Sequence, residues 1–263
     1  MNDPNRSIHR DDPKPSYNEV YLQHVFATID AFGKYHNTLA FFSGNEIVNS
    51  KSNTAAATYA KAVTRDMKNY IKAHIDRPIP VGYSAADVEE SRLQLMKYLD
   101  CGDDEMARGD FFAFNDYSWC GESSFTESGW DQKVEKYKDL TIPLFLSEYG
   151  CNEVKDGDRP FTEVKSLFST DMTGVFSGGL VFEYSQEEND YGLVELTTSL
   201  VTKLSDFTAL KDQFASVENP SGDGDYIKTR KVNECPKIEK GVWEASETLP
   251  AFPKKAETYM VSP

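Results

Sequence analysis

The stretch FFSGNEIVNS, residues 41–50, is an aromatic, apolar run that ends on Gly44-Asn45-Glu46 and becomes polar at once. A continuous apolar segment of this length is typical of a strand buried on both faces, as in a parallel sheet. An unpaired carboxylate is costly to bury, so packing does not explain Glu46 at the end of such a strand. Glu46 is therefore either a solvated loop residue or a residue at the mouth of a site.

The composition narrows the classes of function. The chain has 263 residues, 39% of them hydrophobic and 13% aromatic, enough for one sizeable core or two small ones. The net charge of −15 argues against nucleic-acid binding, because phosphate contacts need clustered Lys and Arg. The 14 Tyr, 16 Phe and 3 Trp suit a protein that stacks flat, uncharged groups such as sugar rings, although the majority of aromatic side chains belong to the core.

No targeting or metal-binding pattern stands out. No stretch approaches the roughly 18–20 apolar residues of a membrane span, and the first 20 residues lack the apolar segment of a signal peptide. The four cysteines match no close-spaced metal pattern, and we expect neither a metal nor a cofactor. An even number allows two disulfides in any of three connectivities, or four buried thiols in a cytosolic protein. The cysteines are Cys101, Cys120, Cys151 and Cys235.

Strand and helix patterns alternate along the chain. Short apolar runs predict strands over residues 38–43, 79–84, 110–117, 142–150 and 178–185. Helical spacing of apolar residues predicts helices over residues 17–35, 53–74, 87–98, about 128–138, 160–171 and 204–216. The alternation predicts an α/β fold with a parallel sheet.

In parallel sheets, functional residues gather at the carboxyl ends of the strands. Every expected strand ends on polar or aromatic residues, and Glu46 and Glu148 each follow an apolar run directly. The strand ends are Asn45-Glu46, Tyr83-Ser84, Asn115-Asp116-Tyr117, Glu148-Tyr149 and Glu183-Tyr184. Glu46 and Glu148 are three strands apart, and strands separated in this way can face each other across the mouth of a barrel.

Two carboxylates across a pocket are what cleavage of a glycosidic bond requires. One protonates the leaving oxygen, and the other attacks the anomeric carbon or activates water. The alternative for each Glu alone is that it caps the next helix or pairs with a surface Lys. Because both follow aromatic strands, we favour a catalytic pair.

Seven segments of the chain carry a family resemblance. They are LAFFSGNEIVN, PVGYSAAD, FNDYSWCG, PLFLSEYGCN, RPFTEV, FSGGLVFEYSQEENDYGLV and GVWEA. Together they resemble glycoside hydrolase family 72, the fungal 1,3-β-glucanosyltransferases of the cell wall, which belong to the clan of retaining (β/α)8-barrel glycosidases. The resemblance extends from about residue 7 to about residue 250.

The resemblance implies roles for the residues at the strand ends. Glu46 would be the general acid/base and Glu148 the nucleophile. Asn45 would bind the sugar 2-hydroxyl, a contact that tightens in the transition state. Tyr117 would donate a hydrogen bond to the nucleophile and fix its orientation.

Aromatic residues would contact the sugars. Tyr184 and Tyr191 correspond to sugar-contacting aromatics of the family, and Trp119 is a further candidate. Phe182 stands where family members often have Tyr. The chain thus departs from the family pattern at a position that would contact the acceptor sugar. The implied ligands are β-1,3-glucan donor and acceptor chains, with no nucleic acid among the partners.

The resemblance also implies two disulfides, Cys120–Cys151 and Cys101–Cys235. The second would tie the 217–240 segment to the barrel. Disulfides indicate an oxidising compartment, and the family implies a location at the outer face of the plasma membrane or in the cell wall.

Only five strands are visible, and the strand that contains Glu46 corresponds to the fourth of eight in the family. We therefore expect strands 4–8 of a TIM barrel, with the earlier strands and a signal peptide encoded upstream. Residues 1–216 would be the C-terminal part of the catalytic domain, and residues 217–263 an extension packed on it. A membrane contact would come only from a GPI anchor of the longer protein.

Three functions remain open. The first is a transglycosylase that transfers β-1,3-glucan to another glucan chain. The second is an endo-β-1,3-glucanase that uses water as the acceptor, and the third is an inactive, truncated chain that binds glucan.

Overall fold

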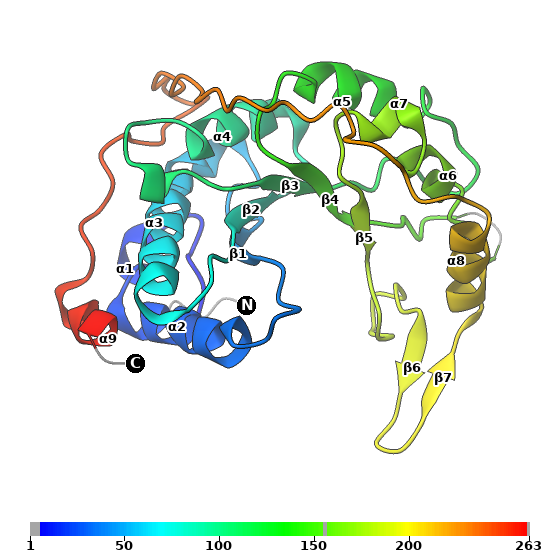
Figure 1. Ribbon diagram of the computed structural model, residues 1–263, viewed down its shortest axis with the longest axis horizontal. Helices are drawn as coiled ribbons and strands as arrows, with labels where there is room; N and C mark the ends of the chain where they lie inside the picture. The colour runs from blue at the N-terminus through cyan, green and yellow to red at the C-terminus, as the bar shows by residue number, and fades with distance from the viewer. Residues whose placement is uncertain (1–5, 155–156, 262–263) are drawn as a thin grey trace. The chain divides into compact units, whose positions relative to one another are not determined.

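The computed structural model describes residues 6–154 and 157–261, which belong to two compact units. The first unit contains the chain up to Ala113 together with the segment from Lys231 onward, and the second contains Phe114–Arg230. Five strands form one sheet in sequence order (Figure 1). They are β1 (Phe41–Asn45), β2 (Val81–Ala85), β3 (Phe112–Asn115), β4 (Leu144–Tyr149) and β5 (Gly179–Val181).

The pairs β1–β2 and β4–β5 are both parallel, and the helices between the strands alternate with them. Phe41 pairs with Val81 in the first unit, and Leu146 pairs with Gly179 in the second. All residues of β2 and β3 are buried, as in strands covered on both faces. The α/β fold predicted from the sequence is therefore confirmed. The expectation of burial on both faces for the run that begins at Phe41 is wrong, because Phe42 of β1 is 40% exposed and Ser43 is the buried residue of this strand.

The helices in the described part of the first unit are α1 (Pro13–Ser16), α2 (Glu19–Gly33), η1 (Lys51–Ala56), α3 (Ala57–His74), α4 (Glu89–Leu99), η2 (Glu105–Ala107), η3 (Lys254–Ala256) and α9 (Glu257–Val261). Of these, α3 contacts α2 as well as β1 and β2. Asn18 begins α2, because its side-chain oxygen accepts hydrogen bonds from the backbone N–H groups of Val20 and Tyr21, both at 3.0 Å. Phe26 of α2 stacks on Tyr70 of α3 at a ring separation of 4.2 Å.

The C-terminal segment of the first unit contributes to its core. The Trp243 side chain is 1% exposed and lies edge-on to Tyr98 at a ring separation of 5.5 Å. The Asn233 side-chain amide donates a hydrogen bond to the Asp100 carboxylate at 2.7 Å. The part of the expected extension from residue 231 onward thus packs with the first unit, whereas residues 217–230 belong to the second.

The described part of the second unit contains the end of β3, all of β4 and β5, and four helices. The helices are α5 (Trp130–Tyr137), α6 (Glu163–Leu167), α7 (Thr170–Thr173) and α8 (Ser205–Ala215). Its core includes Phe114, whose ring contacts Tyr137 of α5 at 5.6 Å and Phe176 at 5.9 Å. The helix expected over 160–171 is thus two short helices, and β5 is shorter than the expected strand.

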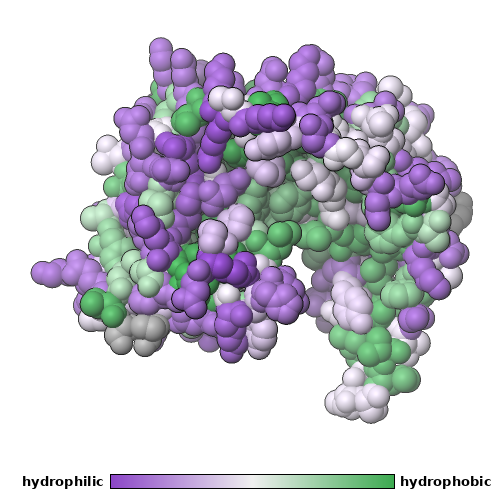
Figure 2. Space-filling model, in the orientation of Figure 1, coloured by the Kyte–Doolittle hydropathy of each residue, from purple (hydrophilic) through white to green (hydrophobic). Residues whose placement is uncertain are grey.

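A hairpin in the second unit was not predicted. It consists of β6 (Val194–Leu196) and β7 (Val201–Lys203), which pair antiparallel and are drawn in yellow in Figure 1. Leu196, Leu200 and Val201 are all at least half exposed, and Figure 2 shows hydrophobic residues along this hairpin.

Candidate functional site

Glu148 lies near the carboxyl end of β4, and its carboxylate is held by a phenol. Its side chain is half-buried, and Oε2 accepts a hydrogen bond from the Tyr117 hydroxyl at 2.5 Å. The backbone carbonyl of Glu148 accepts a hydrogen bond from the N–H of Asp116 at 2.9 Å, which joins the end of β3 to β4. A hydrogen bond from a phenol stabilises the ionised form of a carboxylate and limits its rotation. Glu148 is thus oriented as a nucleophile or a base would be.

Tyr117 is positioned by the buried carboxylate of Asp116. This carboxylate accepts hydrogen bonds from the Ser118 N–H at 3.0 Å, the Ser118 hydroxyl at 2.6 Å and the Trp130 indole N–H at 3.3 Å. It also forms an ion pair with Lys133 of α5. The turn that carries Tyr117 is therefore anchored on α5, so the phenol reaches Glu148 from a fixed backbone.

Aromatic rings surround this hydrogen bond in the second unit. Tyr117, Phe182 and Tyr191 contact one another edge to face, with ring separations of 5.3–6.5 Å. Burial raises the pKa of the Tyr191 phenol, and the negative charge of Glu153 adds to this effect. The phenol of Tyr191 therefore stays protonated and can donate a hydrogen bond. Tyr184 is 57% exposed and offers its ring to solvent.

Trp119 does not share this exposure. Its side chain is 6% exposed, its ring lies 5.0 Å from the Trp130 ring, and its indole N–H donates to the Thr162 hydroxyl at 3.0 Å. A ring covered in this way has little surface on which a sugar could stack. The ring supports the loop after β3 in this structure, and the sugar contact at Trp119 stays a prediction.

In the first unit, Asn45 ends β1 and Glu46 follows it. The Asn45 side-chain oxygen accepts a hydrogen bond from the Ser84 hydroxyl at 2.6 Å, and the Glu46 N–H donates to the Ser84 carbonyl at 2.9 Å. Glu46 has φ +53°, in the left-handed region that residues other than glycine rarely adopt. Two contacts with β2 thus hold a backbone conformation that is unfavourable for Glu.

Gly44 permits close packing beneath this turn. A Cβ atom at Gly44 would lie 2.4 Å from Cδ1 of Ile47 and 3.1 Å from the ring of Tyr83. The Tyr83 ring is buried, and its hydroxyl accepts a hydrogen bond from the Val48 N–H at 3.1 Å. Packing against Ile47 and Tyr83 therefore requires glycine at position 44, directly before the Asn45 and Glu46 expected to act on the sugar.

A pocket of about 680 Å³ in the first unit adjoins the end of β1. Its polar lining comes from the segment before α1 and from Asn45, and its apolar lining from α2 and β1. The lining residues include Arg6, His9, Arg10, Asp11, Tyr21, Val25, Phe42, Asn45 and Ile47. A mixed polar and aromatic lining of this kind suits a hydroxyl-rich ligand.

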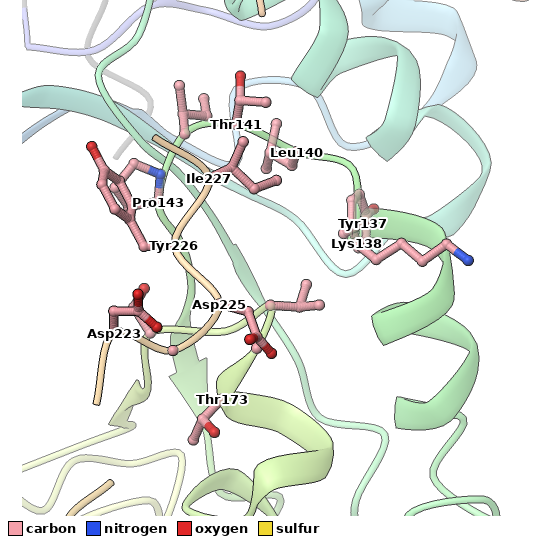
Figure 3. A pocket seen from close by; sticks show the side chains of 15 residues that line it. Tyr137, Lys138, Leu140, Thr141, Pro143, Thr173, Asp223, Asp225, Tyr226 and Ile227 are labelled. Carbon is pink, nitrogen blue, oxygen red and sulfur yellow. The ribbon is translucent and has the colours of Figure 1, made fainter. Parts of the chain in front are cut away.

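A second pocket, of about 200 Å³, lies in the second unit (Figure 3). It is lined by Pro143, just before β4, by Thr173 at the end of α7, and by residues 223–227. No candidate site residue lines it. Because Pro143 precedes β4 whereas Glu148 is near its carboxyl end, this pocket belongs to the other end of the strand.

Two disulfides fix loops within the units. Cys120–Cys151 joins the loop after β3 to the loop after β4, with 5.0 Å between the Cα atoms. Cys101–Cys235 joins the segment after α4 to the C-terminal segment, with 5.1 Å between the Cα atoms. This is the pairing that the family resemblance implies.

Two further features concern metals and membranes. Among residues 6–154 and 157–261, no group of three or more His, Cys, Asp or Glu could hold a metal ion. Over the same residues, no helix is long and apolar enough to cross a membrane.

The structure adds residues whose importance the sequence did not reveal. Arg159 is 2% exposed, and its guanidinium donates hydrogen bonds to the backbone carbonyls of Gly150, Phe182 and Tyr191. The motif RPFTEV contains this residue, but nothing in the motif indicates which carbonyls it binds.

Glu163, at the start of α6, is also buried. Burial raises its pKa to about 7, against the opposing effects of a hydrogen bond from its own backbone N–H and of the Arg159 charge. Its charge lies near Tyr149, the residue after Glu148. The second unit therefore contains a carboxylate that titrates near neutral pH without belonging to the candidate pair.

Comparisons with known proteins agree with the geometry. The family model described as glucanosyltransferase matches residues 1–218. The chain is 57% identical to 1,3-beta-glucanosyltransferase gel1 of Aspergillus fumigatus over 99% of its length, and 55% identical to 1,3-beta-glucanosyltransferase GAS5 of Saccharomyces cerevisiae over 100%.

Among solved structures, Saccharomyces cerevisiae Gas2p in complex with laminaripentaose matches with a TM-score of 0.87. The identity is 39%, and the match covers 98% of this chain and 57% of that one. The chain spans 57% of the length of gel1 and 54% of the length of GAS5, so it corresponds to about half of these relatives.

Proposed function

The chain belongs to the glucanosyltransferase family, and we propose that the protein is a retaining 1,3-β-glucanosyltransferase. In this proposal the protein cleaves a β-1,3-glucan chain and transfers the new end to the 3-hydroxyl of a second chain. The names of the relatives and the laminaripentaose bound to Gas2p support this substrate class.

The hydrogen bond between Tyr117 and Glu148 is the observation that carries the proposal. A carboxylate nucleophile must be ionised and must keep its orientation towards the anomeric carbon. A phenol donor serves both needs, and the Asp116 network keeps that phenol in place.

The proposed reaction has two displacements. The Glu148 carboxylate attacks the anomeric carbon and forms a glycosyl ester, while the bond to the leaving oxygen breaks and Glu46 donates a proton to that oxygen. The 3-hydroxyl of the acceptor then gives its proton to Glu46, and its oxygen displaces Glu148 from the anomeric carbon. Two inversions retain the configuration. Asn45 would hold the 2-hydroxyl during both steps.

Transfer requires that the acceptor compete with water. Water is present at ~55 M, and oriented binding overcomes it because effective molarities of intramolecular reactions reach about 10⁵–10⁸ M. Tyr191 and Tyr184 are the aromatic side chains that we assign to the sugar rings. Their rings offer apolar faces and their hydroxyls offer hydrogen bonds.

We also propose that the protein acts outside the cell membrane, in or near the cell wall, where a GPI anchor would hold it. The two disulfides support an oxidising compartment.

Incubation with a reduced laminari-oligosaccharide tests the function. We expect products longer than the substrate, separated by chromatography. Tyr191→Ala should shift the products towards short hydrolysis fragments and affect cleavage less. Tyr226→Ala is the matched control, because Tyr226 is exposed and lines the pocket at the other end of β4.

The other outcomes separate the alternatives. Only shorter oligosaccharides, even at high substrate concentration, would identify an endo-β-1,3-glucanase. Binding of laminaripentaose without any product would identify an inactive glucan-binding chain.

A further inference from the structure

One buried guanidinium in the second unit joins three segments that end at the candidate site. Nη1 of Arg159 donates to the carbonyl of Gly150 at 3.0 Å and to that of Phe182 at 2.8 Å. Nη2 donates to the carbonyl of Tyr191 at 2.6 Å. Gly150 lies two residues after Glu148, and Phe182 follows β5 directly. The guanidinium therefore fixes the ends of β4 and β5 and the loop with Tyr191 against one another.

Asp206, in the first turn of α8, fixes the guanidinium in turn. Its carboxylate accepts a hydrogen bond from Nε of Arg159 at 2.5 Å and another from the Arg159 backbone N–H at 3.1 Å. Two bonds to one carboxylate set both the position and the direction of the side chain. The planar guanidinium then directs its remaining N–H groups towards the three carbonyls, which an ammonium group could not do with the same geometry.

The Tyr191 ring lies between the Arg159 guanidinium and Tyr117, the residue that donates to Glu148. The Arg159 guanidinium lies 5.6 Å from the centre of the Tyr191 ring, besides its bond to the Tyr191 carbonyl. The Tyr191 ring in turn contacts Tyr117 at 5.7 Å, and Tyr117 donates to Glu148. A displacement of the loop that carries Tyr191 would therefore move a sugar platform while the bond between Tyr117 and Glu148 is held separately by Asp116.

We propose that Arg159, paired with Asp206, is a positioning residue that sets the partition of the glycosyl-enzyme between an acceptor sugar and water. This role rests on the proposed function, since it assigns Tyr191 to the acceptor. Water needs no binding site of its own to reach the anomeric carbon, whereas an acceptor hydroxyl depends on the position of its bound sugar ring, and misplacement by about 1 Å can cost about 10²-fold. The arginine thus controls transfer more strongly than cleavage.

The test compares Arg159→Lys and Asp206→Asn with the wild-type protein. Both variants should lower the ratio of transfer to hydrolysis by about tenfold or more, and raise the KM for the acceptor, while the initial rate of donor cleavage changes about threefold or less. Asp206→Glu keeps the charge, so its ratio of transfer to hydrolysis should lie between those of Asp206→Asn and the wild-type protein.

Arg65→Lys is the matched control. Arg65 belongs to the first unit, forms an ion pair with Asp66 at 2.9 Å and donates to the Pro250 carbonyl at 3.1 Å. Both Arg65→Lys and Arg159→Lys should lower the thermal midpoint, because each loses hydrogen bonds of a guanidinium, but Arg65→Lys should leave the ratio of transfer to hydrolysis unchanged.

The results distinguish the two proposals. If the wild-type protein makes no longer products, the proposed function fails. If it does, and Arg159→Lys or Asp206→Asn keeps the wild-type ratio, the positioning role fails alone. Should Arg159→Lys not fold, Asp206→Asn decides the outcome by itself, because its carbonyl oxygen can still accept one hydrogen bond.

Discussion

Glu46 and Glu148 each stand near the carboxyl end of a parallel strand, yet the two regions differ: β4 is mostly buried, whereas β1 is buried at Ser43 and partly or fully exposed at its other residues. Glu148 lies in regular strand β4, and its carboxylate is bound by the hydroxyl of Tyr117. Glu46 lies one residue beyond β1 with φ +53°, and its backbone N–H is bound by Ser84. The chain at Glu148 keeps ordinary strand geometry, whereas the chain at Glu46 turns in a left-handed conformation.

This difference fits the two roles that we propose. A nucleophile stays ionised until it attacks, so a standing hydrogen bond to its carboxylate is useful. A general acid/base must exchange a proton in both steps, and the left-handed backbone at Glu46 sets the direction in which its side chain leaves the chain. Substitutions at the two positions should therefore have distinguishable effects.

The largest expected effect is the loss of the carboxylates. Glu148→Gln should lower the rate with every substrate by about 10⁴-fold or more, because no covalent intermediate can form. Glu46→Gln should be comparably slow with glucan but much less affected with a glycosyl fluoride, whose leaving group needs no acid. Rates with laminari-oligosaccharide and with the fluoride measure the contrast.

Azide sharpens this experiment. Azide can attack a glycosyl-enzyme without a general base. With the fluoride as substrate, it should therefore raise the turnover rate of Glu46→Gln and leave the rate of Glu148→Gln unchanged. A Glu46→Gln protein that neither azide nor the fluoride rescues would show that the two roles are wrongly assigned.

A smaller effect concerns Glu163 of the second unit, whose carboxyl has a pKa raised by burial. Its pKa is raised from 4.5 to about 7, so the folded state binds a proton that the unfolded state has released between these values. Its contribution to stability is complete below pH 4.5 and is lost as the pH rises to about 7, by up to about 3 kcal/mol.

Glu163→Gln removes this proton exchange. Urea unfolding between pH 4.5 and 7.5 should show that the variant gains stability relative to the wild type as the pH rises. Glu195→Gln, at an exposed position of β6, is the control and should run parallel to the wild type. A constant difference between Glu163→Gln and the wild type would contradict the raised pKa.

The strand ends could be predicted from the sequence, because each strand is a short apolar run that stops at polar residues and is followed by a helical pattern. All five expected strands are present, and Asn45, Glu46 and Glu148 lie where apolar runs end. The hairpin β6–β7 was missed because its loop, residues 197–200, has none of the Asn-Gly or Asp-Gly pairs that mark tight turns.

Contacts between distant residues leave no such pattern. Asp206 is 47 residues from Arg159, and Lys133 is 17 from Asp116, so neither ion pair follows from local spacing. Trp119 illustrates the same limit, because a Trp beside the expected site could face a sugar or the core. The structure shows the ring packed against Trp130, a contact that the sequence does not indicate.

The smallest expected effect compares the backbones at the two carboxylates. Ala at position 46 would adopt a left-handed conformation that costs about 1–2 kcal/mol, and glycine adopts it without that cost. Ala at position 148 would adopt ordinary strand geometry, where glycine costs about 0.5–1 kcal/mol more because its unfolded state has more freedom.

The order of stability should therefore reverse between the two sites. Glu46→Gly should be more stable than Glu46→Ala by about 1 kcal/mol, and Glu148→Gly less stable than Glu148→Ala by a similar or smaller amount. Each pair lacks the same carboxylate, so urea midpoints at one pH isolate the backbone term. If Ala is the more stable residue at both positions, then the conformation at Glu46 is not strained, and the contrast between the two backbones fails.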